Sequence, residues 1–270
     1  MRLCRFQPLE LALSPGRAPL ESHPSARFGL IEDSRVRELP AGLFAPIAPS
    51  SLSFPLDEVR FLPPVLPSKI VCVGRNYREH AAELGNAVPK EPLIFLKPPS
   101  SILAPGEPIL LPPSSQRVDF EGELGVVISR RCSRLSAGDS VAPFILGYTC
   151  LNDVTARDLQ KLDVQFTRAK GFDTFCPFGP VLATHLPEAG ATLETFVNGF
   201  RKQSGHTSGM IFSVDVIIRW ISQVMTLEPG DLIATGTPSG VGPLSSGDVV
   251  EISIGGIGTL SNPVAVSDPS

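Results

Sequence analysis

Short apolar runs separated by glycine and proline make up most of this 270-residue chain. The runs at 70–73, 92–99 and 144–151 have the length and composition of buried strands. One longer segment repeats apolar residues at every third or fourth position from Val214 to Met225, which predicts an amphipathic helix. The pattern therefore predicts many short strands and few helices.

Local signals predict three further elements in the middle of the chain. The segment 118–129 has the pattern of a strand, and 152–162 has helical spacing. Asn76 is a candidate N-cap for a short helix over 77–84, and Gly85 follows its C-terminus. These elements carry most of the candidate site residues.

Two regions of different character are predicted. Residues 1–66 read as a small N-terminal β domain, in which 27–39 has the pattern of a hairpin with a polar turn. A proline-rich connector then leads into the main domain, 67–270, whose last strands are expected within 248–260.

Composition narrows the fold class. With 28 prolines and 24 glycines in 270 residues, a helical bundle or coiled coil is excluded, because proline interrupts the interior of helices. A hydrophobic content of 42% and a formal net charge of −4 exclude disorder. The chain is therefore expected to be globular and rich in β structure.

Charge and cysteine content exclude several functions. The mild negative charge offers no basic face for nucleic acid, and no apolar run approaches the roughly 18 residues of a membrane span. The N-terminus lacks the features of a signal peptide. Five cysteines without a CxxC pair argue against a zinc site or a disulfide scaffold and indicate a reducing compartment. We expect a cytoplasmic protein without nucleic-acid or membrane partners.

Two glutamates in an apolar strand suggest a metal site. Glu121 and Glu123 are two positions apart, so their side chains lie on one face of the strand. Their mutual repulsion is relieved by a divalent cation, and oxygen ligands favour Mg²⁺, Mn²⁺ or Ca²⁺. The alternative is a solvated strand face. Asp153 is the candidate third ligand, with a helix N-terminal carboxylate as its alternative role.

Five motifs resemble the fumarylacetoacetate hydrolase family in order and spacing. They are Gly74-Arg75-Asn76-Tyr77 and the segments 119–124, 152–160, 168–174 and 235–242. The resemblance covers about residues 69–260. It implies a rolled, mixed β-sheet catalytic domain with short edge helices, a mixed β-rich α/β class, and a small extra N-terminal domain. It also implies a homodimer.

The resemblance implies a set of catalytic roles. Glu121, Glu123 and Asp153 would hold one Mg²⁺ or Mn²⁺ ion. His80 and Glu83, three residues apart on the short helix, would form a general-base pair on a mobile lid. Lys170 would stabilise negative charge that develops on the substrate.

The resemblance also implies substrate contacts. Gln160 matches a position that holds the substrate or an oxyanion, and Thr237 matches one that binds the substrate carboxylate through its hydroxyl and backbone N–H. Arg75 and Gly236 are assigned to substrate binding with them. Val73 stands where fumarylacetoacetases proper carry a further aspartate ligand, so fumarylacetoacetate itself is not the expected substrate.

The function implied by the resemblance is a divalent-metal-dependent hydrolase. It would cleave a C–C bond in a 2,4-dioxo acid of the acylpyruvate type, through an enolate held at the metal. The alternative is an oxaloacetate decarboxylase or a 2-oxo/enol acid isomerase (tautomerase) using the same site. A third hypothesis is a metal-binding structural or regulatory domain without activity, which the joint presence of His80, Glu83, Lys170 and Gln160 disfavours.

Overall fold

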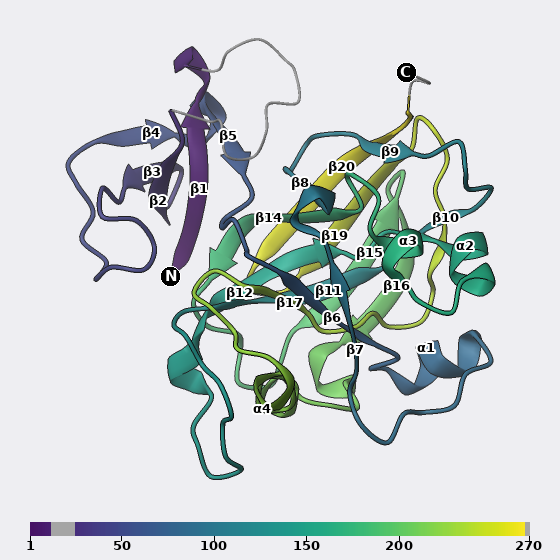
Figure 1. Cartoon of the computed structure of the whole chain (residues 1–270). Helices are drawn as coiled ribbons and strands as arrows, with labels where there is room; N and C mark the ends of the chain where they lie inside the picture. The colour runs from purple at the N-terminus through teal and green to yellow at the C-terminus, as the bar shows by residue number, and fades with distance from the viewer. Residues whose placement is uncertain (12–24, 268–270) are drawn as a thin grey trace.

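The computed structural model describes residues 1–11 and 25–267, and Figure 1 shows that strands dominate it. A twelve-stranded sheet contains β1 (Arg2–Pro8), β2 (Arg27–Glu32), β3 (Arg35–Glu38), β4 (Ser53–Pro55), β5 (Val59–Leu62), β6 (Ile70–Gly74), β7 (Leu93–Lys97), β8 (Ile102–Leu103), β11 (Gly122–Ile128), β12 (Ile145–Asn152), β14 (Cys176–Ala183) and β17 (Leu232–Ala234). Its main path runs β4-β3-β2-β1-β14-β12-β11-β17-β6-β7, with β5 on β1 and β8 on β14. Parallel and antiparallel neighbours both occur, so the predicted mixed sheet is confirmed.

Two smaller sheets complete the β structure. One contains β9 (Ile109–Leu111), β15 (Thr192–Val197), β16 (Phe200–His206), β19 (Val249–Ile254) and β20 (Gly258–Val266), in the order β16-β15-β19-β20-β9. The other joins β10 (Val118–Phe120), β13 (Thr155–Ala156) and β18 (Gly242–Pro243). Buried side chains of β11, β12, β15 and β19 form one core cluster, which therefore lies between the large and the five-stranded sheet.

Helices are few and short in the described part of the chain. The α-helices are α1 (Arg78–Glu83), α2 (Arg157–Leu162), α3 (Thr167–Lys170) and α4 (Val214–Val224). Five 3₁₀ turns accompany them, at Leu9–Leu11, Leu56–Glu58, Pro99–Ser101, Ala142–Phe144 and Thr207–Gly209. The apolar stripe of α4 buries Ile217, Ile218 and Ile221 against side chains of β6, β11 and β17. The predicted amphipathic helix is confirmed, and its apolar face packs on the sheet.

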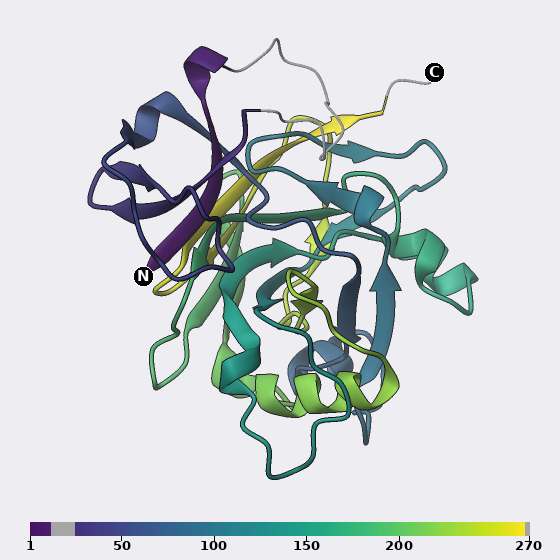
Figure 2. The same cartoon turned by 60° about the vertical axis from the view of Figure 1, so that its left-hand side comes forward.

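The N-terminal strands are continuous with the large sheet. The predicted hairpin is confirmed as β2 and β3, which pair in antiparallel register. β1 pairs with β2 on one side and, through Arg2 to Cys4, with residues 181–183 of β14 on the other. Figure 2 shows these N-terminal strands at one side of the molecule. The N-terminal region is therefore attached to the rest by backbone hydrogen bonds as well as by its connector.

Three sequence predictions differ from the structure around the polar motifs. The strand expected over 118–129 is interrupted at Glu121, because its backbone N–H donates to the Asn152 side chain at 2.9 Å. The helix expected over 152–162 begins only at Arg157, since Asn152 still pairs with Gly122 in the sheet. Asp153 is therefore not a helix N-terminal carboxylate.

Asn76 does not cap α1, whose N-cap is Tyr77. The buried amide of Asn76 instead donates to the carbonyls of Thr235 at 2.7 Å and Phe212 at 3.0 Å, and it accepts from the Phe212 N–H at 2.8 Å. Gly85, with φ of 68°, does follow the helix as predicted. The asparagine thus ties the start of the helical segment to two distant loops.

The cysteines and the helices agree with the expectations from composition. All five cysteines are buried and free, as the composition predicts. None of the described helices combines the length and the apolar character that a membrane crossing requires.

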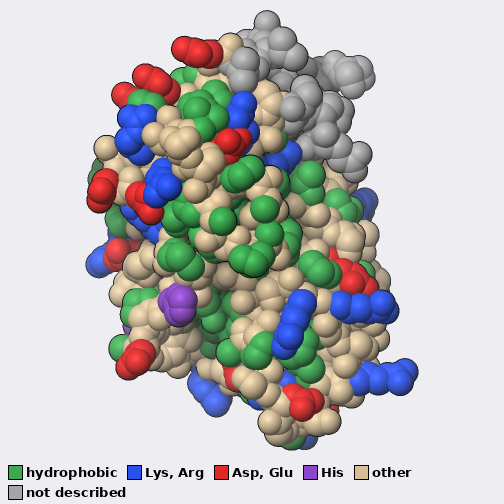
Figure 3. Space-filling model, turned by 90° about the vertical axis from the view of Figure 1, so that its left-hand side faces the viewer, with side chains coloured by type: hydrophobic (Ala, Val, Ile, Leu, Met, Phe, Trp, Pro, Cys, Tyr) green, Lys and Arg blue, Asp and Glu red, His purple; other side chains and the backbone are tan. Residues whose placement is uncertain are grey.

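Hydrophobic side chains gather near the middle of the face shown in Figure 3, with charged side chains around them. Such a surface fits a protein contact, and the homodimer stays a prediction.

The Asn76 contacts predict a large effect on stability. Asn76→Ala leaves buried groups of Phe212 and Thr235 without these partners, so the free energy of unfolding should fall by about 2–4 kcal/mol. Urea denaturation measures the change. The control is Asn86→Ala at a partly exposed position, expected within about 0.5 kcal/mol of wild type. A loss at Asn76 as small as that of the control would contradict the bracing role.

Candidate active site

Three carboxylates meet where β10, β11 and β12 come together. Glu121 lies between β10 and β11, Glu123 is on β11, and Asp153 follows β12, where its backbone N–H donates to the Glu121 carbonyl at 2.9 Å. The three side chains each offer an oxygen within 4.8 Å of the others, and they are 4%, 2% and 1% exposed. The predicted trio is therefore assembled, and it could hold a metal ion.

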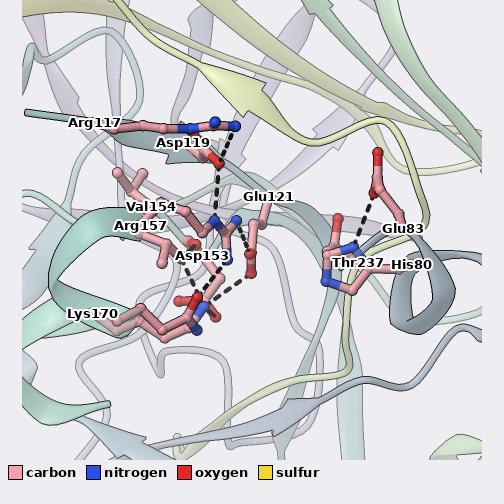
Figure 4. A network of polar contacts seen from close by, with 12 residues as sticks. His80, Glu83, Arg117, Asp119, Glu121, Asp153, Val154, Arg157, Lys170 and Thr237 are labelled. Carbon is pink, nitrogen blue, oxygen red and sulfur yellow. Dashed lines mark hydrogen bonds and ion pairs between the residues drawn. The ribbon is translucent and has the colours of Figure 1, made fainter. Parts of the chain in front are cut away.

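Buried cations lie beside two members of this trio, Glu121 and Asp153 (Figure 4). The Lys170 ammonium donates to Asp153 at 2.6 Å, to the Thr155 hydroxyl at 2.7 Å and to Glu121 at 2.9 Å. Burial lowers the pKa of Lys170, but Asp153 and Glu121 together hold that pKa above its ordinary value. Lys170 is therefore a fixed positive charge beside the carboxylates, as the sequence analysis expects for a group that stabilises negative charge.

Arg157 connects the acids to Gln160, which lines the cavity. Its guanidinium donates to Asp119 at 2.9 Å, to Glu121 at 2.5 Å and to the Gln160 amide oxygen at 2.7 Å. Asp119 is fully buried and also accepts from Arg117. Because its oxygen is occupied in this way, the Gln160 side chain is left with its amide nitrogen as a donor for the cavity that it lines.

Lys97 is a member of the site that sequence reasoning missed. Its side chain, at the end of β7, is fully buried and donates to Asp153 at 2.6 Å and to the Val154 carbonyl at 3.3 Å. The available signal was a single charge at the end of an apolar, proline-bounded run. A lysine there needs a buried anion, because an unpaired charge in an apolar interior is strongly unfavourable.

Glu123 has the least compensation of the three acids. Its carboxylate accepts from the Gly236 backbone N–H at 2.7 Å and has no ion pair with a described residue. Burial, then the neighbouring Asp153 and Glu121, raise the pKa of Glu123 well above its ordinary value. By contrast, burial also acts to raise the pKa of Glu121, but Lys170, Arg157 and His80 lower it below its ordinary value.

The donor set fits a divalent cation. All three groups are carboxylates, which suit Mg²⁺ or Mn²⁺ better than zinc. A positive ion placed among them would relieve the unfavourable charge on Glu123, which forms no ion pair with a side chain of the described chain. Glu121, Glu123 and Asp153 are the residues that would hold the ion.

The His80 and Glu83 pair forms on α1 as predicted. Nδ1 of His80 lies 3.4 Å from a Glu83 carboxylate oxygen, and His80 is only 5% exposed. Glu83 also accepts from the backbone N–H of Gly240 at 3.1 and 3.2 Å. The histidine is therefore oriented from the helix and from the loop after β17.

A cavity of about 250 Å³ brings these groups together. The predicted residues that line it are His80, Glu121, Glu123, Asp153, Lys170, Arg75, Gln160 and Thr237. Val73, Leu84, Phe95 and Phe166 add apolar wall. Glu83 stands behind His80, and Gly236 stands behind Glu123.

Two predicted substrate contacts have other partners in the structure. The Thr237 hydroxyl donates to the Gly122 carbonyl at 2.8 Å and accepts from Gln203 at 2.7 Å. Gly236 is absent from the cavity wall, and its N–H holds Glu123. Its φ of 102°, and a Cβ that would lie 2.6 Å from that of Asn76, explain the need for glycine there.

A buried acid trio that could hold a metal ion and a buried histidine line one cavity, an arrangement that is typical of metal-assisted enzymes. The chain matches the family described as fumarylacetoacetate (FAA) hydrolase C-terminal over residues 69–265, and the family described as Rv2993c-like, N-terminal over residues 1–64. The chain therefore belongs to the fumarylacetoacetate hydrolase family, as the motifs indicate.

Relatives agree with this membership. Protein Rv2993c of Mycobacterium tuberculosis is 55% identical over 215 residues, which are 78% of this chain and 81% of that protein. Oxaloacetate tautomerase YisK of Bacillus subtilis is 45% identical over 230 residues, 79% of this chain and 76% of that protein. The crystal structure of 2-hydroxyhepta-2,4-diene-1,7-dioate isomerase from Mycobacterium marinum matches with a TM-score of 0.86 and 46% identity, over 99% of each chain.

The raised pKa of Glu123 predicts the pH dependence of the metal-free protein. Since the folded pKa lies above the ordinary value of 4.5, the folded state binds the proton more tightly than the unfolded state. The stability that this carboxyl contributes is complete at acid pH and is lost as pH rises through the folded pKa. Glu123→Gln should therefore raise the melting temperature of the metal-free protein at about pH 8 by roughly 2–4 °C, and flatten its pH dependence.

Added Mg²⁺ or Mn²⁺ gives a second readout by thermal melting. Wild type should gain stability with the ion, while Glu123→Gln should gain much less, since only the folded trio binds. Glu91→Gln, at an exposed position, is the matched control and should behave as wild type. Equal gains in wild type and Glu123→Gln would contradict the assignment of Glu123 as a ligand.

Proposed function

We propose that this protein is a metal-dependent enzyme that moves a proton between carbon and oxygen in a small 2-oxo acid, as a tautomerase or isomerase. The observation that carries the proposal is the position of His80. It is buried in the wall of the cavity, braced by Glu83, and close enough to the acids to lower the pKa of Glu121. A single braced base beside a group of carboxylates that could hold a metal ion suits proton transfer at the carbon next to a carbonyl.

Each side chain has a separate role in the proposed reaction. A bound Mg²⁺ or Mn²⁺ would supply Lewis-acid polarisation of the 2-oxo group. His80 takes the proton from the adjacent carbon, and Glu83 orients the imidazole and stabilises its charged form. Lys170 adds a fixed positive charge near the oxygen that becomes negative, and the Gln160 amide donates to the substrate. His80 then delivers the proton to the oxygen of the former 2-oxo group, which gives the enol, so no separate acid is needed.

The relatives support the isomerase alternative of the sequence analysis. One relative is named an oxaloacetate tautomerase and one structural neighbour a diene-dioate isomerase, each at about half identity across most of both chains. Hydrolysis of a 2,4-dioxo acid, placed first from the sequence, becomes the second candidate. The braced His80–Glu83 pair favours it too, because such a pair can activate a water molecule.

Decarboxylation of oxaloacetate gains no separate support. Loss of CO₂ generates the enolate without any proton abstraction, so it does not call for the buried His80–Glu83 pair. The identity of the ion, the homodimer and the cytoplasmic location stay predictions of the sequence.

A panel of substrates tests the function. Purified protein with Mg²⁺ should accelerate the loss of the enol absorbance of oxaloacetate, and a chelator should abolish that acceleration. Release of pyruvate is followed in the same reactions. A parallel reaction with acetylpyruvate reports hydrolysis. Turnover of acetylpyruvate without any effect on oxaloacetate would replace the tautomerase by the hydrolase, and inactivity on both would contradict the proposal.

The base is tested by substitution. His80→Asn should lower kcat for oxaloacetate tautomerisation by about 10²–10⁴-fold, because general-base catalysis contributes that much. Metal binding should persist, since His80 is not among the three ligands. His185→Asn, at an exposed position, should leave kcat unchanged. An unaltered kcat in His80→Asn would remove His80 from the mechanism.

A further inference from the structure

The basic side chains of the cavity fall into two groups. Four line it: Arg75, Arg157, Lys161 and Lys170. Arg157 and Lys170 are committed to Asp119, Glu121 and Asp153 by ion pairs of 2.5 to 2.9 Å. The side chains of Arg75 and Lys161 have no hydrogen bond or ion pair with any residue of the described chain. Two positive charges of the cavity are thus available to a ligand.

Arg75 is the better placed of these two. Lys161 is an exposed residue near the end of α2, whereas Arg75 is half-buried directly after β6. The backbone of Arg75 lies in the left-handed region, with φ of 59°. Residues other than glycine rarely adopt this conformation. Such unfavourable geometry persists where the surroundings impose it, and it often marks a ligand site.

The surroundings of Arg75 do impose its geometry. On its C-terminal side, the three side-chain hydrogen bonds of Asn76 fix the chain to Phe212 and Thr235. On its N-terminal side, β6 pairs with β17 and with β7. The guanidinium is therefore carried by a rigid backbone at the cavity wall, as a preorganised anion site requires.

We propose that Arg75 binds a second carboxylate of the substrate, so that the enzyme prefers a short dicarboxylic 2-oxo acid. The inference rests on the proposed function, in which a metal ion held by the acid trio would polarise the 2-oxo group of the substrate. A guanidinium presents paired N–H donors that match a carboxylate, and that of Arg75 has no ion pair with a residue of the described chain. A cavity of about 250 Å³ suits a substrate of few carbon atoms.

Two acids of four carbons test the preference. Oxaloacetate carries the second carboxylate, and 2-oxobutanoate carries a methyl group in its place. Both acids carry protons on carbon 3 that exchange with deuterium when the acid enolises. The rate of this exchange is measured by NMR in the presence of Mg²⁺ and corrected for the uncatalysed rate. Wild type should show the higher kcat/KM with oxaloacetate.

Substitution of Arg75 should remove this preference. Arg75→Gln should lower kcat/KM for oxaloacetate about 10–100-fold, mainly through KM, and change the value for 2-oxobutanoate far less. Arg75→Lys should retain part of the preference. Arg75→Gly suits the left-handed backbone and provides a well-folded variant without the guanidinium. Arg78→Gln removes an exposed charge three residues away and should preserve the preference.

A binding measurement tests the role of Arg75 independently of the proposed catalytic activity. In His80→Asn protein loaded with Mg²⁺, calorimetry should show tighter binding of oxaloacetate than of 2-oxobutanoate, and addition of Arg75→Gly should abolish the difference. If wild type exchanges neither acid, the proposed function fails while binding still decides the role of Arg75. Equal losses of kcat/KM for the two acids in Arg75→Gln, or an unchanged preference in Arg75→Gln and Arg75→Gly, would overturn the inference.

Discussion

The repulsion among three buried carboxylates is the constraint on which the site depends. Oxygens of Glu121, Glu123 and Asp153 lie within 4.8 Å of one another in a region almost closed to water. The fold meets this cost with Lys97, Lys170 and Arg157, which come from three different elements. Their ion pairs reach Glu121 and Asp153 and omit Glu123, so the cluster keeps a place for one more positive charge.

One loop connects the two halves of the site. The segment that follows β17 holds Glu123 through the Gly236 N–H and Glu83 through the Gly240 N–H. The first contact positions a candidate metal ligand, and the second positions the partner of the base. A displacement of this loop would therefore change both at once, because the same few residues orient them.

The sequence predicted those parts of the site that follow from local patterns or from family motifs. Spacing alone placed Glu121 beside Glu123, and the motifs added His80, Glu83 and Lys170. The long-range contacts could not be predicted in this way. Asn76 has the residue type of a helix cap, yet it binds Phe212 and Thr235, more than a hundred residues away. The Thr237 hydroxyl and the Gly236 N–H likewise have long-range partners, Gly122 and Glu123, which come close only in the folded sheet.

The pairing of β1 with β14 gives the N-terminal region a protective role. β14 has β12 along one side, and residues 181–183 have β1 along the other. A chain shortened by its first 64 residues would leave backbone N–H and C=O groups of 181–183 open to solvent. An open strand edge recruits other strands. The N-terminal region would then decide whether the protein aggregates through the edge of its main sheet.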